Sequence, residues 1–378
     1  MLQRIDLRLF KCFELLRLPL ASLSLLSGSN ASGKSSVLQA LVLLHQTMSE
    51  HEWSTRLMLN GGSIRLGTVA DVVDKVHGRG SFDLRIVTEK EDLSWTFEGE
   101  RSDMSLSVSH VSVNGESQDE PTVLRYLQPP HDDATLSQLT QSILGLTYIT
   151  AERVGPREFY SLEDPQTAPV VGPTGEHAVS LLYLGRDERV IDALVKPDAP
   201  PTRLRQVEYQ MRLFFPGCGL ELQPVPQANA VTLGIRTADD TSFHRPVHVG
   251  FGLTQVFPII VAGLSAKVGD IILIENPEVH LHPAGQAQMG AFLGDLARAG
   301  IQVVIETHSD HVLNGIRRFV KSGGLHAADV LLHFFVPRSV DASQVISPTL
   351  DDSGNIDSWP DGFFDQFDKD MNHFAGWS

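Results

Sequence analysis

Residues 27–39 read SGSNASGKSSVLQ and contain the pattern Gly28-x-x-x-x-Gly33-Lys34-Ser35, which is typical of a phosphate-binding loop. Glycines at these positions let backbone N–H groups approach phosphate oxygens without a Cβ in the way. In such a loop the lysine reaches the β- and γ-phosphates and the serine hydroxyl is a ligand of Mg²⁺. The pattern therefore predicts that Lys34 binds phosphate and that Ser35 binds a metal ion.

The sequence on either side of this loop supports the prediction. Residues 23–26 are apolar enough for a short buried strand, and Val37, Leu38, Leu41 and Leu44 recur at helical spacing. A loop between a strand and a helix places the helix N-terminus against the anion. The alternative, a chance match in a glycine-rich turn, does not account for these flanks. The predicted nucleotide-binding residues are Gly28, Ser29, Asn30, Ala31, Ser32, Gly33, Lys34, Ser35 and Ser36.

Composition limits the classes of function. The chain has 378 residues and a formal net charge of −16, so it carries no global basic surface for nucleic acid, and any such contact must be a local patch or be made by a partner. Its two cysteines, Cys12 and Cys218, cannot build a disulfide framework and favour the reducing cytoplasm. No apolar run reaches the length of a membrane span, and the N-terminus has no signal-peptide core.

The order of predicted elements indicates an α/β fold with a mixed sheet. Residues 1–16 read as a strand pair, residues 82–114 as an antiparallel meander, and residues 116–121 as the polar stretch that closes it. A helix is expected at 134–144, a strand at 146–150, a basic helix at 203–215 and strands near 220–225, 230–237 and 243–249. After residue 250 helices and strands alternate, which predicts a parallel sheet. We expect three segments: residues 1–81, an inserted segment 82–248, and residues 249–378.

Two predicted strands in the last third end in polar residues. The first, residues 271–274, leads to Glu275 at its carboxyl end, where open α/β sheets bind ligands and where an acid can hold Mg²⁺ through water. The second, residues 301–305, is followed by His308, which can hydrogen-bond a γ-phosphate and an attacking water. An acidic strand end without a role is the alternative for Glu275. Helix capping by Ser309 and Asp310 is compatible with a role for His308.

Two weaker signals lie near these strands. Gly250-Phe251-Gly252 precedes a predicted helix, so its N–H groups are available to an anion, but a simple strand-to-helix turn has the same residues. His280 and His282, on one face if the segment is a strand, would suggest a metal site with Glu278; the spacing alone is weak evidence, and no cysteine cluster accompanies it.

The order of these motifs resembles the ABC-type ATPase head, especially the SMC, RecF and overcoming-lysogenization-defect (OLD) group. Phe10-Lys11-Cys12-Phe13 is similar to the group's NFKSF segment, and the phosphate loop is similar to GxNxxGKS. Residues 275–283, ENPEVHLHP, resemble the EEPExHLHP run that carries Walker B and the D-loop, and Thr307-His308-Ser309 resembles the switch histidine. Residues 358–365, SWPDGFFD, resemble the WPxGFFD tail of bacterial AAA-type ATPases whose C-terminal domain has no assigned function, a group that residues 151–157 also fit.

The resemblance implies a P-loop NTPase that binds ATP and Mg²⁺ and hydrolyses ATP. It implies that Lys11 belongs to the nucleotide-binding set, that Ser35 and Glu275 hold Mg²⁺, and that Glu275, Asn276, Glu278 and His308 serve catalysis. It also implies a homodimer with ATP between the copies, in which Gly250 and Gly252 of one chain face the phosphate loop of the other.

The chain departs from the family pattern at two motifs. Asn276 stands where ABC-type heads carry the carboxylate that orients the attacking water, and an amide cannot take a proton, so we expect slow hydrolysis unless Glu278 substitutes. Gly250-Phe251-Gly252 replaces the Ser-x-Gly of the signature motif. Full-length OLD nucleases carry a Toprim nuclease domain after the ATPase, and the roughly 70 residues after His308 are too few for one.

The leading interpretation is a cytoplasmic ATP switch that dimerises around nucleotide and controls a partner protein, a nuclease in phage defence or DNA repair. We expect the partner to dock on the inserted segment 82–248, where Arg203, Arg205 and Arg212 would contact nucleic acid or an acidic partner, or would form a solvated helix face. A transporter's nucleotide-binding subunit and a small-molecule phosphotransferase are the alternatives. The first lacks support from an LSGGQ run, and the second would need neither Gly252 nor His308.

Overall fold

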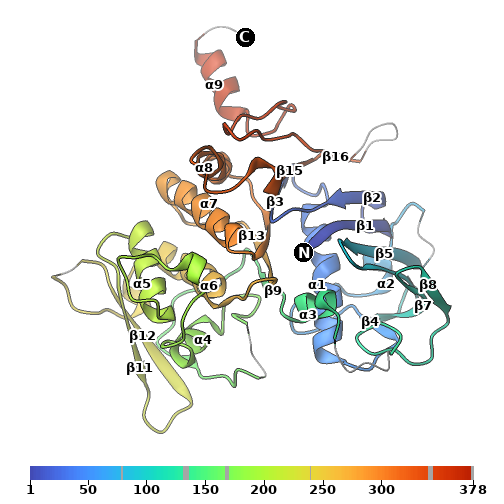
Figure 1. Cartoon of the computed structure of the whole chain (residues 1–378), viewed down its shortest axis with the longest axis horizontal. Helices are drawn as coiled ribbons and strands as arrows, with labels where there is room; N and C mark the ends of the chain where they lie inside the picture. The colour runs from blue at the N-terminus through green and yellow to red at the C-terminus, as the bar shows by residue number, and fades with distance from the viewer. Residues whose placement is uncertain (78–79, 131–135, 167–169, 239, 339–343, 376–378) are drawn as a thin grey trace. The chain divides into compact units, whose positions relative to one another are not determined.

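The computed structural model describes residues 1–77, 80–130, 136–166, 170–238, 240–338 and 344–375 (Figure 1). The chain forms two compact units. Unit 1 comprises Met1–Leu146, Ala328–Asp351 and Ile356–Ser378, and unit 2 comprises Thr147–Ala327 with Asp352–Asn355. The three segments expected from the sequence have other boundaries than these units, and they stay a prediction about how the sequence is organised.

An antiparallel sheet forms one part of unit 1, with the strand order β2-β1-β5-β6-β7-β4 and β8 beside β7. Its meander has the predicted alternation: along β5 the side chains of Phe82, Leu84 and Ile86 are buried and their neighbours are more exposed. Trp95 of β6 is fully buried, and its indole N–H donates to Leu127 O at 2.7 Å. The strands are β1 (Leu2–Phe10), β2 (Phe13–Pro19), β4 (Arg56–Met58), β5 (Ser81–Thr88), β6 (Asp92–Glu98), β7 (Ser105–Val113) and β8 (Glu116–Asp119).

The phosphate loop lies in the other part of unit 1. Strand β3 (Leu23–Gly28) pairs in parallel with β15 (Val330–Phe335), which also pairs antiparallel with β16 (Val345–Ile346). Helix α1 (Lys34–Glu50) follows the loop, and α3 (Gln138–Leu144) packs against it. The short α2 (Val69–Val72) and the C-terminal α9 (Gln366–Phe374) complete the helices described in this unit. The strand, loop and helix around residues 27–39 are therefore confirmed.

Unit 2 contains the predicted βα alternation. Strand β13 (Ile271–Glu275) lies between β9 (Thr147–Ile149) and β14 (Gln302–Glu306), and both pairings are parallel. Helices α7 (Pro283–Arg298) and α8 (Asp310–Lys321) pack closely: a Cβ on Gly290 would lie 2.3 Å from Val312 O, and one on Gly315 would lie 2.1 Å from Ala287 O. Because the strands are parallel, the residues that follow β9, β13 and β14 meet at one edge.

The rest of unit 2 is a helical layer and a small sheet (Figure 1, green to yellow). Helix α6 packs against α4 and α5, and β12 lies between β10 and β11. The elements are β10 (Tyr160–Ser161), α4 (Ala178–Leu184), α5 (Arg203–Phe214), β11 (Gly219–Pro224), β12 (Ala230–Arg236) and α6 (Phe251–Ser265). None of the helices in the described ranges combines the length and apolar composition that crossing a bilayer requires.

Some local predictions were wrong. Residues 243–249 do not form a strand: one bridge joins Ile235 to His244, and Pro246–His248 is a 3-10 turn because proline has no N–H for a ladder. Residues 116–119, expected only as part of the polar stretch that closes the meander, form β8 through backbone pairing with β7. The described part of the helix predicted at 134–144 begins after the Ser137 cap, and residues 134 and 135 lie outside the described residues.

Candidate functional site

The two glycines of the phosphate loop are required by its backbone. Gly28 has φ +137°, and a Cβ there would lie 2.1 Å from Phe335 O of the paired strand. Gly33 has φ +106°, and a Cβ there would lie 2.5 Å from the Phe13 ring and 2.6 Å from Cys12 Sγ. Both positions therefore need the left-handed conformation and the close approach that only glycine allows.

The N-terminus of α1 suits an anion. Its N-cap residue is Gly33, which brings no side-chain cap, and the first turn of this 17-residue helix contains no acid. Backbone N–H groups at such an end keep hydrogen-bonding capacity, and the helix dipole favours negative charge. The structure of this loop therefore fits a phosphate group, as its sequence pattern predicted.

Lys34 lies inside the loop. Its side chain is only 3% exposed, and Nζ donates to Gly28 O at 3.1 Å and to Ser29 O at 2.8 Å. Ser32 Oγ also donates to Ser29 O, at 2.7 Å, which fixes the turn of the loop. The ammonium is thus held by neutral carbonyls, and a phosphate oxygen would be a stronger, charged acceptor for it.

Lys11, in the turn between β1 and β2, contacts helix α1. Its ammonium donates to Gln39 Oε1, and burial lowers the pKa of Lys11 from its ordinary value. Cys12, beside it, places its thiol 3.9 Å from Ser32 O of the phosphate loop. The predicted role of Lys11 in nucleotide binding stays a prediction, and the structure supplies a role in supporting the loop.

Glu275, in unit 2, is held by the neighbouring strand. Tyr148 of β9 donates its hydroxyl to Glu275 Oε1 at 2.7 Å, and Ala151 N donates to Oε2 at 3.3 Å. Burial, followed by the adjacent Glu275 charge, raises the pKa of Tyr148, so this hydroxyl stays protonated and keeps donating. The carboxylate is oriented at the carboxyl edge of the parallel strands, where it can bind a metal ion directly or through water.

Asn276 occupies a sharp turn after β13. Its φ is +44°, in the left-handed region, and its N–H donates to Glu306 O at 2.8 Å. Its side-chain Oδ1 is buried and accepts no hydrogen bond from the described residues. Asparagine tolerates the left-handed region better than glutamate does, so the backbone gives a conformational reason for the residue found at this position.

Glu278 is engaged with the end of β14. Its Oε1 accepts from His308 N at 2.9 Å and its Oε2 accepts from Thr307 Oγ1 at 2.8 Å. Ser309 Oγ accepts from Val312 N at 3.1 Å and caps α8, so capping does occur beside His308. The structure thus brings together the four predicted catalytic residues, which are Glu275, Asn276, Glu278 and His308.

Gly250 and Gly252, at the start of α6, differ in their surroundings. A Cβ on Gly250, the N-cap residue, would meet no atom within 4 Å, whereas one on Gly252 would lie 2.7 Å from His280 O. The Phe251 ring meets the His280 ring edge-on, with centroids 4.9 Å apart. Gly252 is therefore required for packing within the unit, and Gly250 is the open position.

The histidines after Glu278 are not on a strand. His280 has φ +61° in a turn, and His282 Nδ1 accepts from Ala284 N at 3.4 Å at the start of α7. The expectation that both rings share the face of a strand was wrong, because the chain turns sharply after Asn276. Within the described part of the chain, no group of three or more His, Cys, Asp or Glu side chains is arranged to hold a metal ion.

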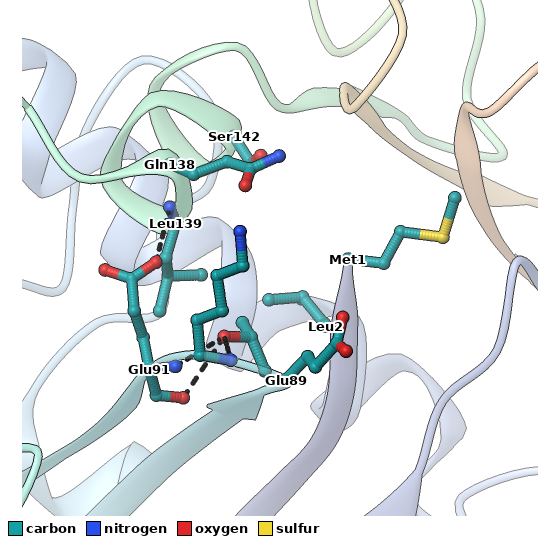
Figure 2. A pocket seen from close by; sticks show the side chains of 9 residues that line it. Met1, Leu2, Glu89, Glu91, Gln138, Leu139 and Ser142 are labelled. Atoms are coloured by element: carbon teal, nitrogen blue, oxygen red, sulfur yellow. Dashed lines mark hydrogen bonds between the residues drawn. The ribbon is translucent and has the colours of Figure 1, made fainter.

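A separate pocket of about 160 Å³ lies in unit 1 where the chain start, the β5–β6 turn and α3 meet (Figure 2). Glu91 Oε2 accepts from Leu139 N at 3.0 Å, so this carboxylate is used at the start of α3. Glu89, Gln138 and Ser142 also line the pocket. The Glu91 hydrogen bond therefore connects the β5–β6 turn to the start of α3 within unit 1.

The sequence did not single out two residues that the structure places at Glu275. Tyr148 binds the carboxylate itself, and Arg153 donates to Glu275 O and Asn276 O at 2.5 and 2.9 Å. Both lie in or just after a predicted strand, and Arg153 belongs to the segment 151–157 that carries the family resemblance. Nothing local identified that strand as the neighbour of β13.

Comparison with known proteins places the chain in a family. Residues 23–314 match a family model described as "AAA domain, putative AbiEii toxin, Type IV TA system". The chain belongs to this AAA-domain family. Residues 325–373 of the AAA-domain chain match a protein family of unknown function, DUF3696, in agreement with the resemblance of residues 358–365.

Individual relatives agree with this assignment. An OLD nuclease of Thermus scotoductus is 24% identical over 347 residues, covering 84% of the AAA-domain chain, which spans 61% of that relative's length. Two solved SMC heads share the fold, each with a TM-score of 0.53 over 92% of this chain. The first, an SMC head bound to the C-winged helix domain of ScpA, is 12% identical, and the match covers 98% of that head. The second, an SMC head bound to the C-terminal domain of ScpA derived from Pyrococcus furiosus, is 11% identical, and the match covers 96% of that head. The expected P-loop NTPase fold of the ABC-ATPase head type is confirmed.

Proposed function

We propose that this AAA-domain protein is a cytoplasmic ABC-type ATPase that binds ATP and Mg²⁺, hydrolyses ATP slowly, and forms a homodimer with ATP between the copies. In this proposal the dimer controls a partner effector, a nuclease in phage defence or DNA repair. The observation that carries the proposal is the preformed loop at residues 28–33, with Lys34 buried inside it at the start of α1.

The residues of the phosphate loop fit the phosphates of a nucleotide, and the metal ligands are proposed from the family resemblance. Gly28–Ser36 would hold the phosphates, with Lys34 exchanging two carbonyl acceptors for phosphate oxygens. Ser35 and Glu275 would hold Mg²⁺, which neutralises developing charge on the phosphate when it is bound. Tyr148 orients the Glu275 carboxylate through a 2.7 Å hydrogen bond.

The proposal of slow hydrolysis rests on Asn276 and Glu278, which follow Glu275 in the same turn. Asn276 can hydrogen-bond a water but cannot accept its proton. Glu278 has both oxygens engaged with Thr307 and His308, so acting as the base would require it to leave a 2.8 Å and a 2.9 Å hydrogen bond. We propose that ATP binding, rather than rapid turnover, sets the state of the protein.

The proposed dimer contact is Gly250 at the open N-terminus of α6. Nothing within 4 Å covers the space where its side chain would be, so a phosphate bound to a second copy can approach this helix end. Gly252, which packs on His280 O within the same chain, supports the position of Gly250 rather than making the contact.

The effector step is assigned to a partner protein. The relative from Thermus scotoductus is named a nuclease, which supports a nuclease as the effector. The solved SMC heads are bound to ScpA domains, which supports a head that acts through another protein. Two heads fixed around ATP would hold two copies of one docking surface in a defined arrangement. A partner could bind both copies only in that arrangement. We keep the inserted segment 82–248 as the proposed docking region.

If the dimer binds nucleic acid directly, we propose that the contact is made by a groove beside α8 and not by the arginines of α5. The arginines of α5 are used within unit 2: Arg203 pairs with Glu188 at 2.6 Å, and Arg205 and Arg212 both pair with Glu208. A groove of about 430 Å³ beside α8 is lined by Arg317, Arg318 and Lys321 among others, and the last two form no ion pair with any described residue.

The test is to purify the protein alone and with the products of its neighbouring genes. We expect ATP-dependent dimerisation of the chain alone, a slow ATPase, and nuclease activity only with a partner. A purified chain that cuts DNA with metal and no partner would overturn the assignment of the effector step. A chain that phosphorylates a small molecule and stays monomeric with ATP would favour the phosphotransferase instead.

A further inference from the structure

Arg153 is a buried cation at the turn that carries Asn276. It follows β9, its side chain is 7% exposed, and Nη2 donates to the backbone oxygens of Glu275 at 2.5 Å and of Asn276 at 2.9 Å. One guanidinium nitrogen therefore bridges the two backbone carbonyls on either side of the Asn276 Cα, the residue in the left-handed region.

This arginine is incompletely satisfied. Its Nε and Nη1 are buried and have no hydrogen-bond partner among the described residues, and neither has Asn276 Oδ1. Burial lowers the pKa of Arg153 to about 10, opposed by the charges of Glu278 and Glu275, so the group stays cationic at neutral pH. Leaving buried donors unpaired destabilises a fold, so stability alone does not favour arginine at this position.

The backbone of Arg153 is tied to α6. Gln255, which is 2% exposed, donates through Nε2 to Arg153 O at 3.4 Å. The same helix touches the other end of the turn, because Gly252 packs against His280 O and Phe251 against the His280 ring. The first turns of α6 thus contact the segment 275–280 directly at one end and through Arg153 at the other.

We propose that Arg153 is a positioning residue that couples the start of α6 to the turn carrying Asn276. A displacement of α6 moves Gln255 and the Arg153 backbone, and the guanidinium transmits that movement to the Glu275 and Asn276 carbonyls. The inference rests on the proposed function in one respect: the event that displaces α6 is the approach of a nucleotide bound to a second copy at Gly250.

The variants separate the charge of Arg153 from the placement of its donor atom. Arg153→Met removes the charge and both hydrogen bonds of Nη2, whereas Arg153→Lys keeps a cation on a shorter side chain that does not place a donor where Nη2 lies. Arg203→Lys is the matched control, because Arg203 is 8% exposed in the same unit and pairs with Glu188, away from Glu275.

The first measurement is amide hydrogen exchange of each variant without nucleotide. We expect Arg153→Met to raise exchange about tenfold in both 250–256 and 275–282, with Arg153→Lys intermediate and Arg203→Lys unchanged in both segments. Faster exchange in 275–282 alone would show that Arg153 supports the turn without linking it to α6, and would overturn the coupling. Unchanged exchange in both segments would overturn the inference altogether.

The second measurement separates kcat from KM in the ATPase reaction. We expect Arg153→Met to lower kcat about tenfold, with KM and ATP affinity within about threefold of wild type, and Arg153→Lys to recover part of kcat. Equal losses of kcat, ATP affinity and thermal stability would contradict a positioning role. If wild type binds no ATP, the proposed function fails, and the exchange experiment still decides whether Arg153 links the two segments.

Discussion

Gly250 and Gly252, at the start of α6, give a sharp test of the proposed dimer, because the same carboxylate has opposite effects on the monomer at the two positions. Gly250 has φ −60° and ψ 141°, ordinary N-cap angles, and open space at its Cβ. Aspartate is a favoured N-cap residue, so Gly250→Asp should leave the monomer unchanged or stabilise it by about 0.3–1 kcal/mol. At Gly252 any Cβ meets His280 O at 2.7 Å, so Gly252→Asp should destabilise unit 2 by about 1–3 kcal/mol.

The assay combines urea unfolding with sedimentation velocity in ATP and Mg²⁺. Gly250→Asp should keep the unfolding midpoint and ATP binding of wild type, yet stay monomeric, because its carboxylate would face phosphate. Gly250→Ser is the control, with an N-cap side chain and no charge, and it should still dimerise. Wild-type dimerisation by Gly250→Asp would refute the contact at α6. Equal destabilisation by both aspartates would refute the argument from packing.

Three further predictions concern the catalytic turn and one buried histidine. Asn276→Glu should raise the rate of ATP hydrolysis by supplying a base. It should also destabilise the fold by about 1–2 kcal/mol, because glutamate would adopt the left-handed backbone conformation. An unchanged rate in a phosphate-release assay would show that the missing carboxylate does not limit turnover. Glu278→Gln should keep the contacts to His308 N and Thr307 and lower the rate less than about tenfold; a complete loss would make Glu278 the base. His333 donates from Nε2 to Pro19 O and accepts at Nδ1 from Ser347, and burial lowers its pKa to about 4, so the unfolded chain binds a proton that the folded chain excludes. The free energy of unfolding should therefore fall as pH drops from about 6.5 toward 4. The urea midpoint of His333→Gln should depend less steeply on pH in that window than the midpoint of wild type does. Equal slopes for the two proteins would count against His333 as the cause.

The parts of the site that sequence predicted are those written in consecutive residues. The loop at 28–35 could be predicted because glycine spacing, a buried strand and a helical repeat all lie within about 25 residues. The helix start expected at Ser309 and Asp310 is found at α8 (Asp310–Lys321), because a capping residue is a local signal.

The parts that sequence missed depend on which strands become neighbours. Tyr148 meets Glu275 across 127 positions only because β9 pairs with β13, and the contact of Arg153 with Asn276 has the same origin. The partner of Arg203, Glu188, lies on a separate segment, so sequence could not pair them. Arg205 and Arg212 pair with Glu208 of the same helix, a local spacing that the sequence interpretation did not use. The prediction of a strand at 243–249 was wrong. It relied on the alternation of apolar residues and gave too little weight to Pro246, which cannot donate a ladder hydrogen bond.

The most direct test of the central claim, that this is an ATP-binding switch built on the loop at Lys34, is equilibrium titration of ATP with and without Mg²⁺. Lys34→Ala is the perturbation, and Lys11→Ala is the comparison, because Lys11 contacts Gln39 outside the phosphate loop. We predict saturable binding by wild type that Mg²⁺ strengthens, loss of binding in Lys34→Ala with an unchanged circular dichroism spectrum, and a smaller loss in Lys11→Ala. Equal ATP affinity of wild type and Lys34→Ala would contradict the account.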